Sequence, residues 1–95
     1  MRIFIEIKKI DASLEIKIKD NAGGIEDEIM NRIFEPYFTT KEEKQGTGLG
    51  LFMCNEIVTK HLKGDIQVRN VNFEYKNKTY RGAEFTIILP IEVAK

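Results

Sequence analysis

The N-terminal part of the chain alternates between apolar and charged residues with a period of two, which is typical of half-buried β-strands. The alternation covers residues 2–19 and is interrupted by Asp11-Ala12-Ser13. The apolar residues that would share one face are Ile3, Ile5, Ile7, Leu14, Ile16 and Ile18. This pattern predicts a β-hairpin with one buried face.

A short helix is predicted over residues 26–33. Glu26-Asp27-Glu28 places negative charge where the positive end of a helix dipole would stabilise it, and apolar residues then recur at four-residue spacing. Pro36 forbids continuation, because proline lacks an amide donor and restricts the residue before it.

A longer helix is predicted over residues 48–62 and ends at Gly64. Its wide apolar face, which should lie against a sheet as part of the core, comprises Leu51, Met53, Cys54, Ile57, Val58 and Leu62. Its polar stripe comprises Asn55, Glu56, Thr59, Lys60 and Lys63. The one histidine, His61, would lie at the C-terminal end of this helix, where a partial positive charge is favourable.

The last third of the chain predicts strands again. Ile66 and Val68 begin one strand, Lys76-Asn77-Lys78 forms a polar turn, and a last strand covers residues 83–89 before Pro90. The order strand, strand, helix, helix, strand, strand predicts an α+β two-layer sandwich, with helices on one face of a mostly antiparallel sheet. A chain of 95 residues is one small domain, without a second core.

Charge and cysteine content exclude several classes of protein. The 15 basic and 15 acidic residues leave no basic excess, so no nucleic-acid partner is expected. The longest stretch without a charged residue, Gln45 to Asn55, is well short of the roughly 20 residues that span a bilayer, so no membrane contact is expected. A single cysteine fits a reducing compartment, and a cytoplasmic location is expected.

Three clusters of residues could carry chemistry. In Asp20-Asn21-Ala22-Gly23-Gly24-Ile25, glycines would let the backbone approach a flat ligand and the carboxylate would accept a hydrogen bond, although a turn with a helix cap explains the same residues. Phe34-Glu35-Pro36-Tyr37-Phe38-Thr39-Thr40-Lys41 has as its alternative a hydrophobic plug beneath a loop. In Gly46-Thr47-Gly48-Leu49-Gly50-Leu51, free N–H groups at a helix start favour an anion, but the spacing matches neither the P-loop nor the dinucleotide fingerprint.

Taken in this order, the clusters resemble the first glycine box, the phenylalanine box and the second glycine box of the ATP-binding domain of two-component sensor histidine kinases. The gyrase, mismatch-repair and heat-shock chaperone ATPases share the glycine boxes, whereas residues 34–41 are similar to the histidine kinase form. The segment from Gly82 to Pro90 resembles the final strand of that family. The resemblance implies a Bergerat-type ATP-binding fold.

The resemblance also implies a division of roles at an ATP site. Asp20 would accept a hydrogen bond from the adenine amino group, and Gly24 beside Ile25 would let the backbone pass close to the base. Residues 39–47 would form a lid anchored by Phe34 and Phe38, in which Lys41 or Lys44 screens phosphate charge. The residues that would hold the phosphates are Gly46, Thr47, Gly48, Leu49 and Gly50.

Two features depart from the family pattern. Ala83 stands where the family often has a threonine near the adenine, so one polar contact is expected to be lost. The asparagine box, the helix that supplies the family's Mg²⁺ ligand and general base, is absent. We therefore interpret residues 1–95 as a single partial domain, a Bergerat-type fold without its N-terminal helix, with no catalytic residue and little or no kinase activity alone. Sheet surface uncovered in this way predicts self-association of the chain.

For an intact parent, the resemblance implies ATP and Mg²⁺ as cofactors. The γ-phosphoryl group would pass to a histidine on a partner dimerisation domain and then to a response regulator, and an upstream segment could anchor the parent in a membrane. Two alternatives stay open: a non-catalytic nucleotide-sensing or protein-interaction module, and an anti-sigma factor serine kinase. The phenylalanine box argues against the latter.

Overall fold

The computed structural model describes residues 2–36, 38 and 50–91. Its elements follow the predicted order of two strands, two helical segments and two strands. Their bounds are β1 (Ile3–Ile10), β2 (Ser13–Asp20), α1 (Asp27–Met30), α2 (Gly50–Glu56), the π-helical turn η1 (Ile57–His61), β3 (Asp65–Tyr75) and β4 (Lys78–Pro90).

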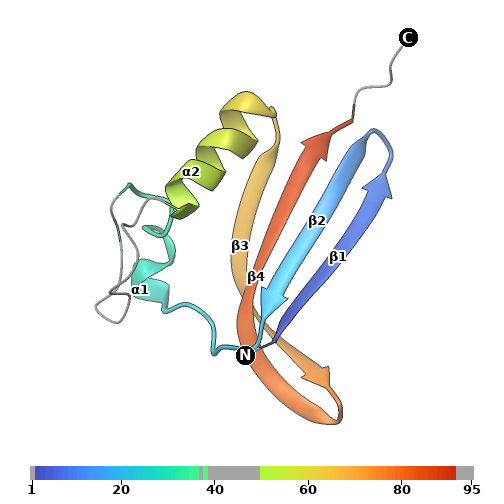
Figure 1. Cartoon of the computed structure of the whole chain (residues 1–95). Helices are drawn as coiled ribbons and strands as arrows, with labels where there is room; N and C mark the ends of the chain where they lie inside the picture. Colours follow the sequence, from blue (N-terminus) through green and yellow to red (C-terminus); the bar gives the residue numbers. More distant parts are fainter. Residues whose placement is uncertain (1, 37, 39–49, 92–95) are drawn as a thin grey trace.

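The four strands form one sheet in the order β1-β2-β4-β3, and every neighbouring pair is antiparallel. The helices lie on one side of this sheet, as Figure 1 shows. The prediction of an α+β fold with helices on one face of an antiparallel sheet is therefore confirmed.

Both hairpins turn on residues with left-handed backbone angles. Lys76 and Asn77 have φ of 51° and 64°, the combination that a two-residue turn needs to match the twist of its strands. Asp11 has φ of 52° in the β1–β2 turn. The two predicted turns are therefore confirmed, although β2 and β4 already begin at Ser13 and Lys78, the last residue of each predicted turn.

The core lies between the helices and the β3–β4 half of the sheet. Its most buried apolar residues are Ile33, Val58 and Ala83, with exposed fractions of 8%, 7% and 4%. The ring of Phe34 packs edge-on against Phe85 of β4, with 6.3 Å between ring centroids. The apolar contact that holds the helical layer in place therefore falls on β4 and β3.

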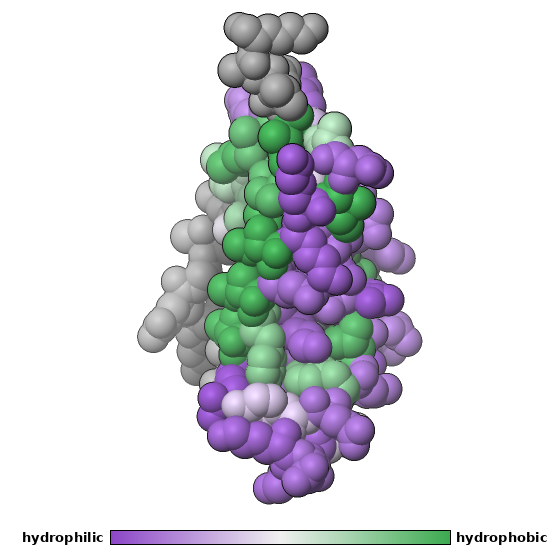
Figure 2. Space-filling view, turned by 90° about the vertical axis from the view of Figure 1, so that its right-hand side faces the viewer, coloured by the Kyte–Doolittle hydropathy of each residue, from purple (hydrophilic) through white to green (hydrophobic). Residues whose placement is uncertain are grey.

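The prediction of a buried face on the first hairpin is wrong for β1. Ile3, Ile5 and Ile7 are 55%, 65% and 61% exposed, because β1 is the edge strand farthest from β3 and no described helix covers it. The view toward this edge of the sheet in Figure 2 shows a continuous band of apolar surface. The expected uncovered sheet surface is thus present on the described part of the chain.

The second helix also differs from its prediction. It changes from an α-helix to a π-helical turn at Ile57. Of its six expected core residues only Val58 is buried, and five are exposed: Leu51, Met53, Cys54, Ile57 and Leu62. Asn55 and Glu56, expected on the polar stripe, are half-buried instead. A sheet contacts only part of the circumference of a helix. Because the apolar face of this helix is wide, several rotations about the helix axis would bury apolar side chains, and tertiary packing decides which one occurs.

No helix among the described residues is long and apolar enough to span a bilayer.

Candidate functional site

Asp20, the last residue of β2, has one carboxylate oxygen held by the backbone. The N–H groups of Ala22 and Ala83 both donate to Asp20 Oδ1, at 3.0 and 3.3 Å. Among the residues that the structure describes, Asp20 Oδ2 has no hydrogen-bond partner. The carboxylate is therefore oriented through one oxygen and can accept a hydrogen bond from a ligand through the other.

Gly82 is the residue that allows this arrangement. A Cβ at Gly82 would overlap the backbone carbonyl of Asp20, so the end of β2 can approach β4 this closely only where β4 lacks a side chain. Gly82 is buried and directly precedes Ala83, whose N–H group orients the carboxylate. The position of the acidic group thus depends on a glycine more than 60 residues away in the sequence.

The two glycines after Asp20 have left-handed backbone angles, with φ of 101° at Gly23 and 86° at Gly24. The Gly23 N–H group donates to the Arg81 carbonyl at 2.9 Å. A Cβ at Gly24 would lie 2.7 Å from Asn70 Oδ1, whereas a Cβ at Gly23 would meet nothing within 4 Å. Gly24 is therefore required both by its backbone angle and by close packing.

Ile25 is fastened to the sheet by a residue that the sequence analysis did not identify. The Ile25 N–H group donates to Asn70 Oδ1 at 2.7 Å, and Asn70 Nδ2 donates to the Ile25 carbonyl at 2.7 Å. The sequence did contain an indication of this role. Asn70 follows Ile66 and Val68 at two-residue spacing and so shares their face of β3, where the alternation predicts an apolar side chain and not a polar one.

The structure therefore brings together Asp20, Gly24 and Ile25, three of the predicted site residues. Gly50 begins α2 and is exposed. The other predicted site residues, Lys41, Gly46, Thr47, Gly48 and Leu49, lie outside the described residues, as does the proposed lid. The described part of the site is thus a carboxylate at the end of β2 and the glycine-containing backbone that follows it, beside Ala83 within β4 and Asn70 within β3.

The phenylalanine cluster contributes two aromatic contacts beside this region. Phe34 packs on Phe85, and the guanidinium of Arg32 lies 4.6 Å from the ring centroid of Phe38. Both rings are half-buried. Both contacts lie shortly after α1, where the chain leaves this helix.

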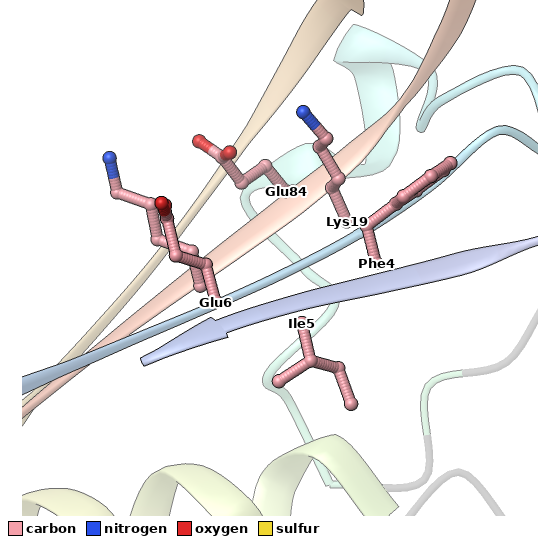
Figure 3. Close-up of a pocket in the computed structure, with 6 residues that line it drawn as sticks. Phe4, Ile5, Glu6, Lys19 and Glu84 are labelled. Atoms are coloured by element: carbon pink, nitrogen blue, oxygen red, sulfur yellow. The ribbon is translucent and has the colours of Figure 1, made fainter. Parts of the chain in front are cut away.

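The hollows found among the described residues lie elsewhere. One, of about 230 Å³, is lined by residues of β1, β2 and β4, and Figure 3 shows Phe4, Glu6, Lys19 and Glu84 on one side of the sheet and Ile5 on the other. It is smaller than the roughly 300–1,000 Å³ of typical ligand pockets. Its polar groups also have partners within the protein: Glu84 pairs with Arg69 at 2.9 Å, and Lys19 lies over Phe73. We do not assign a ligand to it.

The described residues do not fit a magnesium site on their own. No group of three or more His, Cys, Asp or Glu side chains within residues 2–36, 38 and 50–91 could hold a metal ion. A nucleotide base fits better, because Asp20 offers an acceptor and Gly24 offers bare backbone.

Comparison with known proteins identifies relatives of the chain. The family model described as histidine kinase-, DNA gyrase B-, and HSP90-like ATPase matches residues 1–93. AtoS, a signal transduction histidine-protein kinase of Escherichia coli, is 42% identical over 81 residues, or 85% of the chain. The two-component sensor PprA of Pseudomonas aeruginosa is 40% identical over 82% of the chain, and sporulation kinase D of Bacillus subtilis is 36% identical over 98%. The chain spans only 12%, 8% and 16% of the lengths of these three relatives.

Solved structures agree with the sequence relatives. A nucleotide-free catalytic domain of the histidine kinase ThkA matches 93% of this chain with a TM-score of 0.70 at 30% identity, and the match covers 51% of that structure. The mycobacterial sensor histidine kinase MprB matches 94% of the chain with a TM-score of 0.75 at 27% identity, over 58% of its own chain. The chain therefore belongs to the histidine kinase-, DNA gyrase B- and HSP90-like ATPase family, as part of a catalytic ATPase domain of the sensor histidine kinase type.

Proposed function

We propose that the chain binds ATP, with the adenine between Asp20 and the backbone at Gly24. The observation that supports this most is the oriented carboxylate, because Asp20 Oδ1 accepts from two backbone N–H groups and no described residue donates to Oδ2. An ionised carboxylate is an acceptor only, so it suits the amino group of adenine and not the 6-oxo group of guanine. Gly24 and Ile25 supply backbone that a flat base can approach.

The phosphates are proposed to lie at residues 46–50, against backbone N–H groups where the helix of Gly50 begins. Lys41 is proposed to screen their charge from the lid. These roles rest on the family resemblance and on the residue types, since glycines remove the side chains that would keep a phosphate away.

For the whole protein, we propose that the γ-phosphoryl group of ATP passes to a histidine on a partner domain and then to a response regulator. This transfer depends on positioning and on neutralisation of charge, to which Mg²⁺ contributes when bound. We expect the chain alone to bind nucleotide with little or no kinase activity. The family and its relatives favour neither alternative, the non-catalytic nucleotide-sensing or protein-interaction module or the anti-sigma factor serine kinase.

ATP binding can be tested by calorimetric titration of the chain, paired with an assay for release of phosphate. We expect saturable binding of ATP with no metal-dependent turnover. Gly24→Ala should bind ATP at least about tenfold more weakly than Gly23→Ala, because both variants share backbone strain but only the first meets Asn70. Equal binding by the two variants, or no binding by the unmodified chain, would contradict the proposed site.

We also propose that two copies of the chain associate through β1. This strand is at the edge of the sheet, and Ile3, Ile5 and Ile7 on its helix-side face are more than half exposed. An antiparallel pairing of two β1 strands centred on Ile7 would place Glu6 of each copy opposite Lys8 of the other. Apolar surface and unpaired backbone groups would thereby be covered together.

Sedimentation velocity over a range of concentrations tests this association. The chain should dimerise. Ile5→Lys should raise the dissociation constant of the dimer at least about tenfold, because it places a charge inside the contact. Ile57→Lys is the matched control, since Ile57 is 45% exposed but lies on η1. A chain that is monomeric at every concentration, or equal dissociation by both variants, would contradict the proposal.

A further inference from the structure

We infer that Asn70 is a positioning residue of the nucleotide site, which sets the distance between the Asp20 carboxylate and the backbone at Gly24 and Ile25. This inference rests on the proposed ATP site. Asn70 lies in the middle of β3, 45 residues from Ile25 in the sequence, and it belongs to none of the clusters that the sequence analysis assigned to the nucleotide.

The side-chain amide of Asn70 uses both of its polar ends on one residue. Its Oδ1 accepts from the Ile25 N–H group and its Nδ2 donates to the Ile25 carbonyl, each at 2.7 Å and partly buried. The amide thus pairs with Ile25 as a neighbouring strand would. It supplies a donor and an acceptor where residues 21–26 have no strand of their own.

Fastening on both sides confines Gly24. Gly23 is held by the Arg81 carbonyl on one side and Ile25 by Asn70 on the other. The backbone of Gly24 then passes against the Asn70 amide so closely that a Cβ would lie 2.7 Å from Oδ1. The part of the backbone proposed to face the base therefore has little freedom to shift.

One rung of the sheet carries both halves of the proposed adenine site. Asn70 pairs with Ala83 across β3 and β4. The Ala83 N–H group orients Asp20, and the Asn70 side chain holds Ile25. The carboxylate of Asp20 and the backbone at Ile25 are thus held by two residues that pair with each other, Ala83 and Asn70. Loss of the Asn70 amide would therefore release the backbone at Ile25 and leave the Asp20 carboxylate in place.

The chemistry of the side chain makes the inference specific. Asn70→Asp keeps the shape and the acceptor for the Ile25 N–H group, but it places an oxygen against the Ile25 carbonyl. Asn70→Leu has a similar volume and removes both hydrogen bonds. The expected order of ATP affinity is therefore the unmodified chain, then Asn70→Asp, then Asn70→Leu.

The experiment measures calorimetric dissociation constants for ATP, GTP and inorganic triphosphate with the full chain, together with amide hydrogen exchange at Ile25. Asn70→Leu is expected to weaken ATP binding at least tenfold, to lower the preference for ATP over GTP, and to leave triphosphate binding within about twofold. Exchange at Ile25 should become faster. A purely structural role would instead weaken ATP and triphosphate together.

Asn72 provides the matched control, because it lies two residues along β3 on the same face and opposite Arg81. Asn72→Leu and Asn72→Asp should bind ATP as the unmodified chain does. Should Asn70→Leu fail to fold, Asn70→Asp carries the test, with the same required loss of preference for ATP. The inference is overturned if the unmodified chain binds ATP and a folded Asn70 variant binds it equally well. Failure of the unmodified chain to bind ATP would instead overturn the proposed function, and with it the positioning role.

Discussion

Asp20→Asn is expected to bind ATP about 100-fold more weakly than the unmodified chain while retaining its fold. The asparagine oxygen can still accept from the N–H groups of Ala22 and Ala83, so the backbone contacts of the carboxylate are preserved. Its nitrogen, however, replaces Oδ2 and presents a donor to the donor amino group of adenine. The loss therefore combines a missing charge-assisted hydrogen bond with an unfavourable pairing.

The same substitution should change nucleotide preference, which a general loss of structure would not do. The new N–H group can donate to the 6-oxo group of guanine, so the ratio of the GTP and ATP dissociation constants should fall. Titration with both nucleotides and thermal unfolding of the free chain measure the two effects. Asp11→Asn is the control, because it removes the same charge in the β1–β2 turn, where φ is 52° and asparagine is tolerated. Retention of wild-type ATP affinity by Asp20→Asn would remove the adenine assignment.

Gly82→Ala should cause the largest loss of stability, at least about 3 kcal/mol, which is the upper end of typical overpacking costs. The new Cβ would overlap the backbone carbonyl of Asp20, and backbone cannot move aside as a flexible side chain can. β2 and β4 would have to separate at this point. The Ala83 N–H group would then lose its contact with Asp20, so ATP binding should fall together with stability.

Urea unfolding followed by far-ultraviolet circular dichroism measures this loss. Gly50→Ala is the appropriate comparison, since a Cβ there meets nothing within 4 Å and alanine favours a helix by about 1 kcal/mol over glycine. It should leave stability unchanged or raise it. A Gly82→Ala variant within about 1 kcal/mol of the unmodified chain would show that β2 and β4 do not approach each other so closely.

Local patterns were sufficient where the deciding forces act between neighbours in the sequence. Alternation of apolar and charged residues predicted the strands, and polar residues predicted both turns, because side chains alternate across a strand and few residues accept left-handed angles. Asp20 and Gly24 could be proposed as site residues for a similar reason: a carboxylate followed by glycines at the end of a strand is a local feature. The order of the elements then implied the α+β fold.

Patterns failed where burial depended on which element covers which. The isoleucines of β1 have the alternation of a buried face, yet they are exposed because the helices pack over β3 and β4. The apolar face of the second helix covers too much of its circumference to define one orientation, and Cys54 is exposed while Asn55 is half-buried. Hydrophobicity indicates that a residue can be buried, but neighbouring elements decide whether it is.

The sequence by itself determined the order of strands and helices, the glycines and carboxylate of the proposed adenine site, and the resemblance to histidine kinases. Only the tertiary structure decided that Gly82 makes room for Asp20 and that Asn70 holds Ile25. Both contacts join segments that are far apart in the sequence and meet through the pairing of β3, β4 and β2. The register of these strands places the residues opposite each other, and register arises from the packing of the whole sheet.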